Sequence, residues 1–397
     1  MTSLERRATA GLASIFGLRM FGLFLVLPVF SIYGAALGGA TPVLIGLAIG
    51  VYGLTQALLQ IPMGFASDRF GRKPVIVLGL LVFAAGSVLA GMSDHIFGVI
   101  AGRALQGAGA IAAAVMALAS DLTEPRYRTR VMAFIGMSVG LSFLAALMLG
   151  PVIAAGYGLS GLFWFTAVLA LAAIAVLYLV VPDAPSRPRQ ADARPIAAYV
   201  GEVLRNGDLL RLNTGIFTLH FVMTATFIAV PLVLLTQLEL PVERHWQVYV
   251  PVLLLSVVGL VPAIIIGERY HAQRLITLLA VAALVAATFL LAATVHSGWL
   301  FLVPLWLYFA AFNILEASLP ALVSRYAPAS FKGTALGVYS TCQFAGAFAG
   351  GLFGGVVLGL GGTWGVFLLC GAVTLPWLAV TGSLRPLPVT TPLETAD

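Results

Sequence analysis

Only 9% of the 397 residues are charged and 60% are hydrophobic, with a mean hydropathy of +1.04. Because an average soluble domain is about 25% charged, this chain cannot cover a water-exposed surface of its own size, and the bilayer must solvate most of it. The formal net charge of +6 fits basic residues that face anionic lipid and requires no nucleic-acid partner.

A membrane-spanning helix needs about 20 apolar residues, so twelve spans with short loops account for nearly the whole chain. The first span follows Arg6 and Arg7 and lacks a cleavage site, so we interpret it as a retained signal anchor. The fold expected is an all-α membrane protein with twelve transmembrane helices. Its spans lie near residues 13–35, 43–65, 74–92, 96–118, 131–153, 162–182, 209–235, 246–266, 275–294, 299–322, 333–357 and 363–384.

A polar stretch at 183–208 separates the sixth and seventh spans and contains several prolines and charges of both signs. Proline clusters between apolar segments mark loops, so we interpret this stretch as a cytoplasmic linker with one surface helix. The predicted organisation is a six-helix bundle over 1–182, the linker, and a second six-helix bundle over 209–397 that ends in a short cytoplasmic tail.

The Lys and Arg residues fall almost entirely on one side of this arrangement. With the N-terminus inside, all of the 21 except Arg19, Arg103 and Arg244 lie on the inner side. Arg19 and Arg103 fall within spans, and Arg244 lies outside. Since basic loops are retained in the cytoplasm, the pattern predicts a multi-pass protein of a bacterial inner membrane with both termini cytoplasmic.

The two halves repeat one another about 200 residues apart. In the second span Pro62 is followed six residues later by Asp68 and then an arginine, and in the eighth span Pro262 is followed by Glu268 and an arginine at the same spacing. Recurring six-helix units of similar hydropathy could arise by chance, but the matched spacing favours duplication. Two six-helix bundles around a shared central cavity are the architecture of rocking transporters.

The loop between the second and third spans carries the most specific motif in the chain. It reads Gly64-Phe-Ala-Ser-Asp68-Arg69-Phe-Gly71-Arg72-Lys73. Gly64 allows two helices to approach closely, and Gly71 allows a tight reversal. A short cytoplasmic loop needs basic residues in any case, but that need does not explain the carboxylate and the two glycines at this spacing.

This loop resembles motif A of the major facilitator superfamily, G-x-x-x-D-R-x-G-R-K, at every defined position. Arg103, Gln106 and Gly107 in the fourth span resemble motif B of the family, while Gly140, Gly150 and Pro151 in the fifth span resemble the antiporter motif C, with alanines at several glycine positions. The resemblance covers essentially the whole chain and is closest to bacterial drug:proton antiporter-like proteins of the YajR type. That type carries a soluble C-terminal domain, which the short tail here predicts to be lacking.

The resemblance implies two roles. The loop motif would form a latch in which Asp68 and the arginines meet an acid at the cytoplasmic end of the fourth span, and Asp121 stands at that position. The latch would hold the outward-facing state. The resemblance also places the first, fourth, seventh and tenth spans around the cavity, and the four ionisable groups inside spans (Arg19, Arg103, His220 and Glu316) occupy those four spans.

Glu316 is the only acid well inside a span, and His220 lies near the middle of the seventh span. Because a buried carboxylate and a histidine can exchange protons near neutral pH, we hypothesise that they form a proton-coupling site with Arg103. A structural bridge between helices remains the alternative, as does an Arg103 that extends to the outer headgroups.

A cation at Arg19 disfavours organic cations, so a neutral or anionic amphiphile is the expected substrate. Span position alone suggests further cavity residues, although core packing explains each aromatic equally well. These candidates are Phe24, Tyr33, Gln56, Gln106, Asn313, Tyr339 and Gln343.

Three classes of function remain open. The first is proton-coupled efflux of a small amphiphile, and the second is facilitated or symport carriage of a nutrient or organic anion, which the weakened motif C leaves open. The third is a membrane enzyme or sensor, but the chain shows no catalytic cluster, no zinc-ligand spacing and no Walker sequence. We interpret Cys342 and Cys370 as core residues. The expected partners are a small molecule, protons and lipid, with no cofactor, and a monomer suffices.

Overall fold

The computed structural model describes residues 1–183, 196–270, 272–328 and 332–385. Over these ranges the chain is helical and forms no named strand, which confirms the all-α class. The helices in chain order are α1 (Ser3–Phe24), α2 (Phe30–Tyr33), α3 (Pro42–Phe70), α4 (Arg72–Gly91), α5 (Ile96–Ala108), α6 (Ala112–Asp121), α7 (Arg128–Leu179), α8 (Ile196–Arg205), α9 (Gly207–Thr236), α10 (Trp246–Arg269), α11 (Gln273–Thr294), α12 (Leu302–Tyr326) and α13 (Lys332–Gly382).

Within the described ranges, nine candidate spans are long and apolar enough to cross a membrane. Two of them, α7 and α13, each contain a reversal at one glycine, Gly158 (φ +65°) and Gly362 (φ +61°). A residue with a Cβ rarely adopts such a φ. Each of these long helices therefore accommodates two of the expected spans, and α1 with the short α2 accommodates the first.

The structure differs from the expected spans at two places. Helix α1 ends at Phe24, and the chain continues through i→i−3 turns before α2 begins, because Pro28 lacks an N–H and disfavours helical geometry in the residue before it. The fourth span is broken into α5 and α6 at Gly109, whose backbone leaves the helix (φ −72°, ψ +44°). The break leaves the Gly109 carbonyl free to accept a side-chain hydrogen bond.

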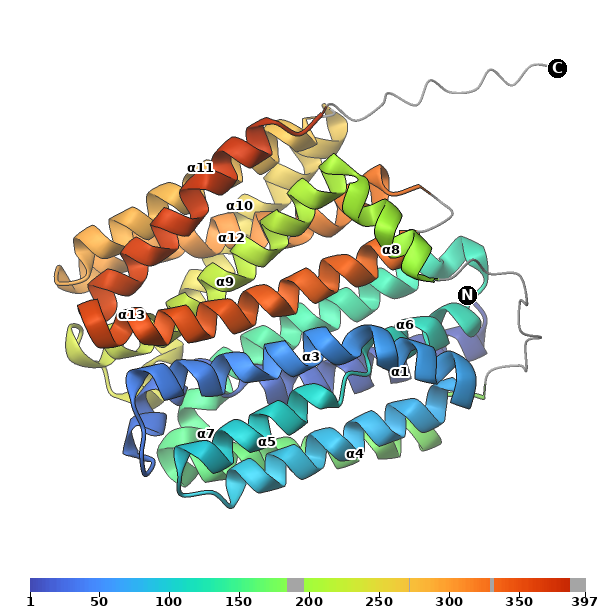
Figure 1. Cartoon of the computed structure of the whole chain (residues 1–397), viewed down its shortest axis with the longest axis horizontal. Helices are drawn as coiled ribbons and strands as arrows, with labels where there is room; N and C mark the ends of the chain where they lie inside the picture. The colour runs from blue at the N-terminus through green and yellow to red at the C-terminus, as the bar shows by residue number, and fades with distance from the viewer. Residues whose placement is uncertain (184–195, 271, 329–331, 386–397) are drawn as a thin grey trace.

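Two groups of helices lie side by side along the long axis of the molecule, with α1 and α3–α7 in one half and α9–α13 in the other (Figure 1). We call the end that carries the N-terminus and α8 the terminal end. The halves touch through the backbones of α3 and α13. A Cβ on Gly46 would lie 2.2 Å from the carbonyl oxygen of Gly351, and one on Gly53 would lie 2.5 Å from that of Phe344.

This contact lies at the end away from the termini, since α3 begins there and α13 reaches it in mid-course. On the stretches of α7, α10 and α13 nearer the terminal end, a Cβ on Gly136, Gly140, Gly259, Gly333 or Gly337 would meet no atom within 4 Å. Glycine-mediated contact between the two halves is therefore seen at the far end.

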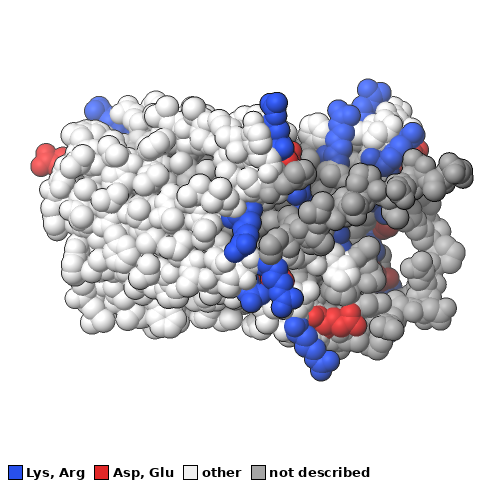
Figure 2. Space-filling view, turned by 90° about the horizontal axis from the view of Figure 1, so that it is seen from above, with Lys and Arg blue, Asp and Glu red and all other residues white. Residues whose placement is uncertain are grey.

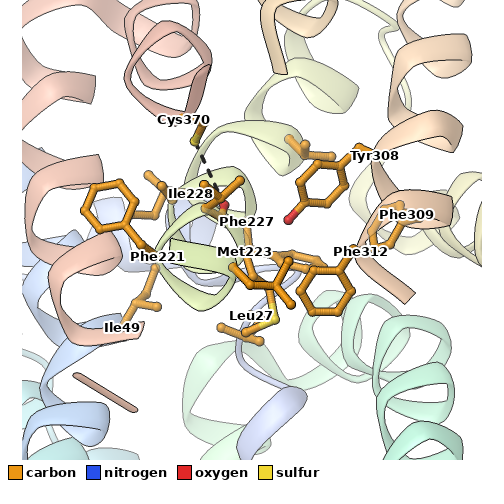
Figure 3. Packing of buried hydrophobic residues seen from close by; sticks show 14 of the residues in the cluster. Leu27, Ile49, Phe221, Met223, Phe227, Ile228, Tyr308, Phe309, Phe312 and Cys370 are labelled. Atoms are coloured by element: carbon orange, nitrogen blue, oxygen red, sulfur yellow. Dashed lines mark hydrogen bonds between the residues drawn. The ribbon is translucent and has the colours of Figure 1, made fainter. Parts of the chain in front are cut away.

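Helix α9 runs through the hydrophobic core of the second half. Phe227 on α9 packs against Tyr249 and Phe309 of the same half and against Phe143 of α7, and Figure 3 shows Phe221, Met223 and Ile228 from the same helix among their neighbours. Both cysteines are free, and Cys370 is fully buried in this core.

Charged side chains are concentrated at the terminal end. In Figure 2 the Lys and Arg side chains on the visible face gather toward that end, and the opposite end shows few charges. The half of this face away from the terminal end is largely uncharged, as a surface facing lipid tails must be. The prediction that this end faces the cytoplasm depends on this clustering of Lys and Arg.

Candidate functional site

The loop between α3 and α4 is held together by Arg72. Its Nε lies 3.2 Å from Asp121 Oδ2 at the end of α6, its Nη1 donates to Ser67 Oγ at 2.8 Å, and it also pairs with Asp68. The guanidinium of Arg72 thus joins the carboxylate of Asp68 in the loop to that of Asp121 on α6. Because Arg72 and Asp121 are each about one-fifth exposed (22% and 24%), water screens the attraction only in part.

The glycines of this loop occupy positions where a side chain is unfavourable. Gly71 has φ +98° and separates α3 from α4, and a Cβ on Gly64 would lie 3.3 Å from the Cβ of Ala113 on α6. Lys73 binds the Val181 carbonyl and Asp183, both at 2.7 Å, and so ties the loop to the end of α7. The guanidinium of Arg69 lies over the Phe70 ring.

Arg103 on α5 is buried in the first half and fastens α5 to α3. Its Nε and Nη2 donate to the carbonyls of Ala48 and Ile49, and its Nη1 donates to Gln106 Oε1 at 2.9 Å. Gln106 in turn donates to Ser87 on α4. Each guanidinium nitrogen has an acceptor, so the structure brings Arg103 to the α3 backbone and not to the His220 and Glu316 side chains.

Arg19 on α1 is fully buried and has fewer partners. Its Nη2 donates to Gln56 Oε1 at 2.7 Å and to the Gly109 carbonyl at 3.1 Å, where the α5–α6 break exposes that oxygen. Its Nε and Nη1 have no hydrogen-bond acceptor in the described part of the chain. The guanidinium lies over the rings of both Tyr52 and Phe83, 5.9 and 5.5 Å from their centroids.

Three polar side chains meet in the second half. The Gln343 amide nitrogen on α13 lies 2.8 Å from His220 Nε2 on α9 and 3.4 Å from Glu316 Oε1 on α12. His220 Nε2 and Glu316 Oε2 are 3.8 Å apart. The Glu316 side chain is 40% exposed, whereas that of His220 is 9% exposed. We call these three residues the polar triad.

The remaining predicted cavity residues are dispersed. Asn313 donates to Ser256 on α10 at 2.6 Å, Phe24 packs edge-on against Phe143, and the Tyr339 hydroxyl is buried without a partner in the described residues. Tyr33 lines a separate cavity of about 310 Å³ at the end away from the termini. Both aromatic residues, Phe24 and Tyr33, also pack against the hydrophobic core.

The motif C residues Gly140, Gly150 and Pro151 differ in how closely other parts of the chain approach them. A Cβ on Gly150 would lie 2.7 Å from the Leu25 carbonyl, so this glycine allows α7 to approach the turn after α1. Gly140 meets nothing within 4 Å. Pro151, one residue after Gly150, lies inside α7 and is buried.

The structure also shows a buried carboxylate that motif reading missed. Glu5 accepts the backbone N–H of Thr2 at 2.7 Å and that of Glu124 at 3.0 Å, which fastens the start of α1 to the loop after α6. The hydrogen bond from Glu124, followed by that from Thr2, lowers the pKa of the Glu5 carboxyl below its usual value. The capping-box spacing of Thr2 and Glu5 was the available signal.

Two bundles of apolar helices, a charged terminal end and a polar cluster inside each half define a polytopic α-helical membrane protein of the transporter class. The chain matches the model of the Major Facilitator Superfamily over residues 12–351, and it belongs to that family.

Its relatives are transporters. The chain is 47% identical over 394 residues to the inner membrane transport protein YajR of Escherichia coli, covering 99% of this chain and 87% of that protein. It is 25% identical to multidrug resistance protein 2 of Bacillus subtilis over 93% of each chain. The structure of a D-xylose-proton symporter superposes with a TM-score of 0.75 at 15% identity, covering 96% of this chain and 98% of that one.

Proposed function

We propose that this transporter couples proton movement to the efflux of a small neutral or anionic amphiphile by alternating access. The observation that carries the proposal is the polar triad, since two proton-exchanging side chains from α9 and α12 are bridged by one amide from α13. Three helices of one half thus converge on a group whose charge can change.

The hydrogen bonds suggest where a proton would bind. Because a side-chain amide nitrogen only donates, His220 Nε2 accepts from Gln343 and carries no proton in this state. Glu316 Oε2 is buried and has no hydrogen-bond partner in the described residues, so a proton can bind there without breaking a hydrogen bond. We therefore assign proton binding to Glu316, with transfer to His220 across the 3.8 Å between them.

The loop motif supplies the conformational part of the proposal. With the terminal end cytoplasmic, Arg72 holds Asp68 and Asp121 together at the inner membrane surface. A charge at such a position gains or loses about 2.3 kcal/mol per 100 mV if it crosses the membrane field. The membrane potential would thus act on the charges of Arg72, Asp68 and Asp121 as well as on the polar triad.

The buried arginines bear on the substrate. Among the described residues, no carboxylate pairs with Arg19 or Arg103, so the first half holds an uncompensated positive charge. Such a charge repels organic cations and attracts anions. This argument supports a neutral or anionic amphiphile.

A facilitative or symport carrier of a small organic anion is the second candidate. The specific observation in its favour is the open surroundings of Gly140, because close helix approach through motif C is seen only at Gly150.

The test uses purified protein in liposomes that contain a pH-sensitive dye, with neutral, anionic and cationic amphiphiles added in turn. We expect substrate-driven proton flux in the wild type and none in Glu316→Gln, while Glu268→Gln, an exposed acid at the end of the same half, keeps the flux. Substrate movement without proton flux, or proton flux in the same direction as the substrate, would instead support the second candidate. If Glu316→Gln keeps the same substrate-driven proton flux as the control Glu268→Gln, Glu316 has no part in the coupling.

A further inference from the structure

A basic cavity lies at the terminal end of the second half, away from the polar triad. Its volume is about 370 Å³, and its walls come from the end of α8, the start of α9 and the segment after α13. The lining residues are Arg205, Asn206, Gly207, Asp208, Arg211 and Arg385.

The charges around this cavity do not cancel. Asp208 pairs with Arg211 at 2.9 Å, and Arg211 also donates to Ser383 Oγ. The side chains of Arg205 and Arg385 have no hydrogen bond or ion pair with any described residue. The walls therefore hold an excess of two positive charges, both on guanidinium groups.

The start of α9 adds little to this site, because its own side-chain cap is already in place. Asn206 Oδ1 accepts the backbone N–H groups of Asp208 and Leu209 at 3.0 and 3.2 Å. Attraction for a ligand must come from the guanidinium groups, whose planar N–H pairs match the oxygens of a phosphate.

We propose that this cavity binds the phosphate of an anionic phospholipid headgroup. The cavity opens at the terminal end, where the basic side chains gather (Figure 2), and basic pockets between membrane helices at the cytoplasmic surface suit such headgroups. The need for basic residues to set membrane orientation explains why arginines lie at this end. It does not explain why they share a cavity or why two of them lack counter-ions. The bound phosphate would fasten α8 to the second half.

The experiment titrates the purified full-length protein with phosphatidylglycerol, phosphatidylcholine and inorganic phosphate in separate arms. Bound copies are counted by native mass spectrometry, and melting temperature is the second readout. The variant is Arg205→Gln with Arg385→Gln. The control is Arg269→Gln with Arg325→Gln, which removes the same charge from exposed positions at the same end.

We expect one phosphatidylglycerol to bind the wild type and the control with equal affinity, and the cavity variant to bind about thirtyfold more weakly, since each arginine contributes about 1 kcal/mol. Phosphatidylcholine should bind more weakly than phosphatidylglycerol. If inorganic phosphate raises the melting temperature of the wild type but not of the cavity variant, and phosphatidylglycerol raises neither, the cavity is a phosphate site whose ligand is a soluble ion. Equal binding of phosphatidylglycerol and phosphate by wild type and cavity variant would overturn the proposal.

Discussion

Gly46 on α3 and Gly351 on α13 bring the two halves of the protein into backbone contact. A Cβ on Gly46 would lie 2.2 Å from the Gly351 carbonyl oxygen, and one on Gly351 would lie 2.6 Å from the Gly46 carbonyl oxygen. Neither position has room for a methyl group. The contact can form only while both residues are glycine, so it marks a surface where the halves close against each other.

The first prediction concerns this contact. Because backbone atoms cannot move aside cheaply, Gly46→Ala should destabilise the closed contact by roughly 1–3 kcal/mol and shift the protein toward states with the halves apart. The readout is thiol labelling of Ile49→Cys, since Ile49 is buried in the same core beside Phe221 (Figure 3). Labelling should accelerate with Gly46→Ala and should not with Gly259→Ala, whose Cβ meets nothing.

The second prediction concerns the amide of the polar triad. Gln343→Leu keeps the approximate volume but removes the donor to His220 and Glu316, which should cost about 1 kcal/mol per lost bond and lower substrate-driven proton flux on the order of tenfold. Liposome flux measures the effect, with the exposed Gln247→Leu as control. Unchanged flux in Gln343→Leu would show that the amide has only a packing role.

The third prediction contrasts the two buried arginines of the first half. Arg19 has two nitrogens without acceptors in the described residues, whereas every nitrogen of Arg103 has one. A buried charge that lacks partners is costly, so Arg19→Met, which removes that charge, should melt no lower than the wild type. Arg103→Met should lose at least about 2 kcal/mol.

Melting temperature and a substrate panel check the contrast between Arg19→Met and Arg103→Met. Arg19→Met should also admit cationic amphiphiles that the wild type excludes, because the repelling charge is gone. If Arg19→Met melts much lower than the wild type and still excludes cationic amphiphiles, both the stability prediction and the selectivity prediction are wrong.

The fourth prediction is a pH dependence at the terminal end. Backbone N–H groups of Glu124 and Thr2 lower the pKa of Glu5 in the folded protein, so its contribution to stability is present above the unfolded pKa and is lost as pH falls through the folded pKa. Wild type should melt above Glu5→Gln at pH 7, and the difference should shrink toward zero in acid. A difference independent of pH would exclude a role for the carboxylate charge.

Local rules account for much of what the sequence predicted. The reversal at Gly71 and the close approach at Gly64 follow from the lack of a Cβ, and both are visible in the spacing of one loop. Pro28 was a readable signal for the early end of α1, but the expected first span at 13–35 ran through it. The break at Gly109 was harder to predict, because glycine in a membrane helix more often permits packing than a break.

Contacts between distant segments were expected only between ionisable residues, such as His220 and Glu316. Nothing in a single chain indicates that Gln343 reaches both His220 and Glu316, since the rotation of α13 about its axis is set by packing against α9 and α3. The same applies to Arg103, whose partners are carbonyls of α3 and therefore carry no side-chain signature. A charge inside a span is readable from the sequence, but a partner that is a carbonyl or an amide is not.

Gly158 and Gly362 reverse the chain in α7 and α13 with nearly the same backbone angles, at equivalent places in the two halves. A reversal made by one residue leaves no slack between the two helices it joins. Each half therefore contains two helices whose ends are joined directly, so neither helix of the pair can shift lengthwise by a turn unless the backbone at its glycine changes.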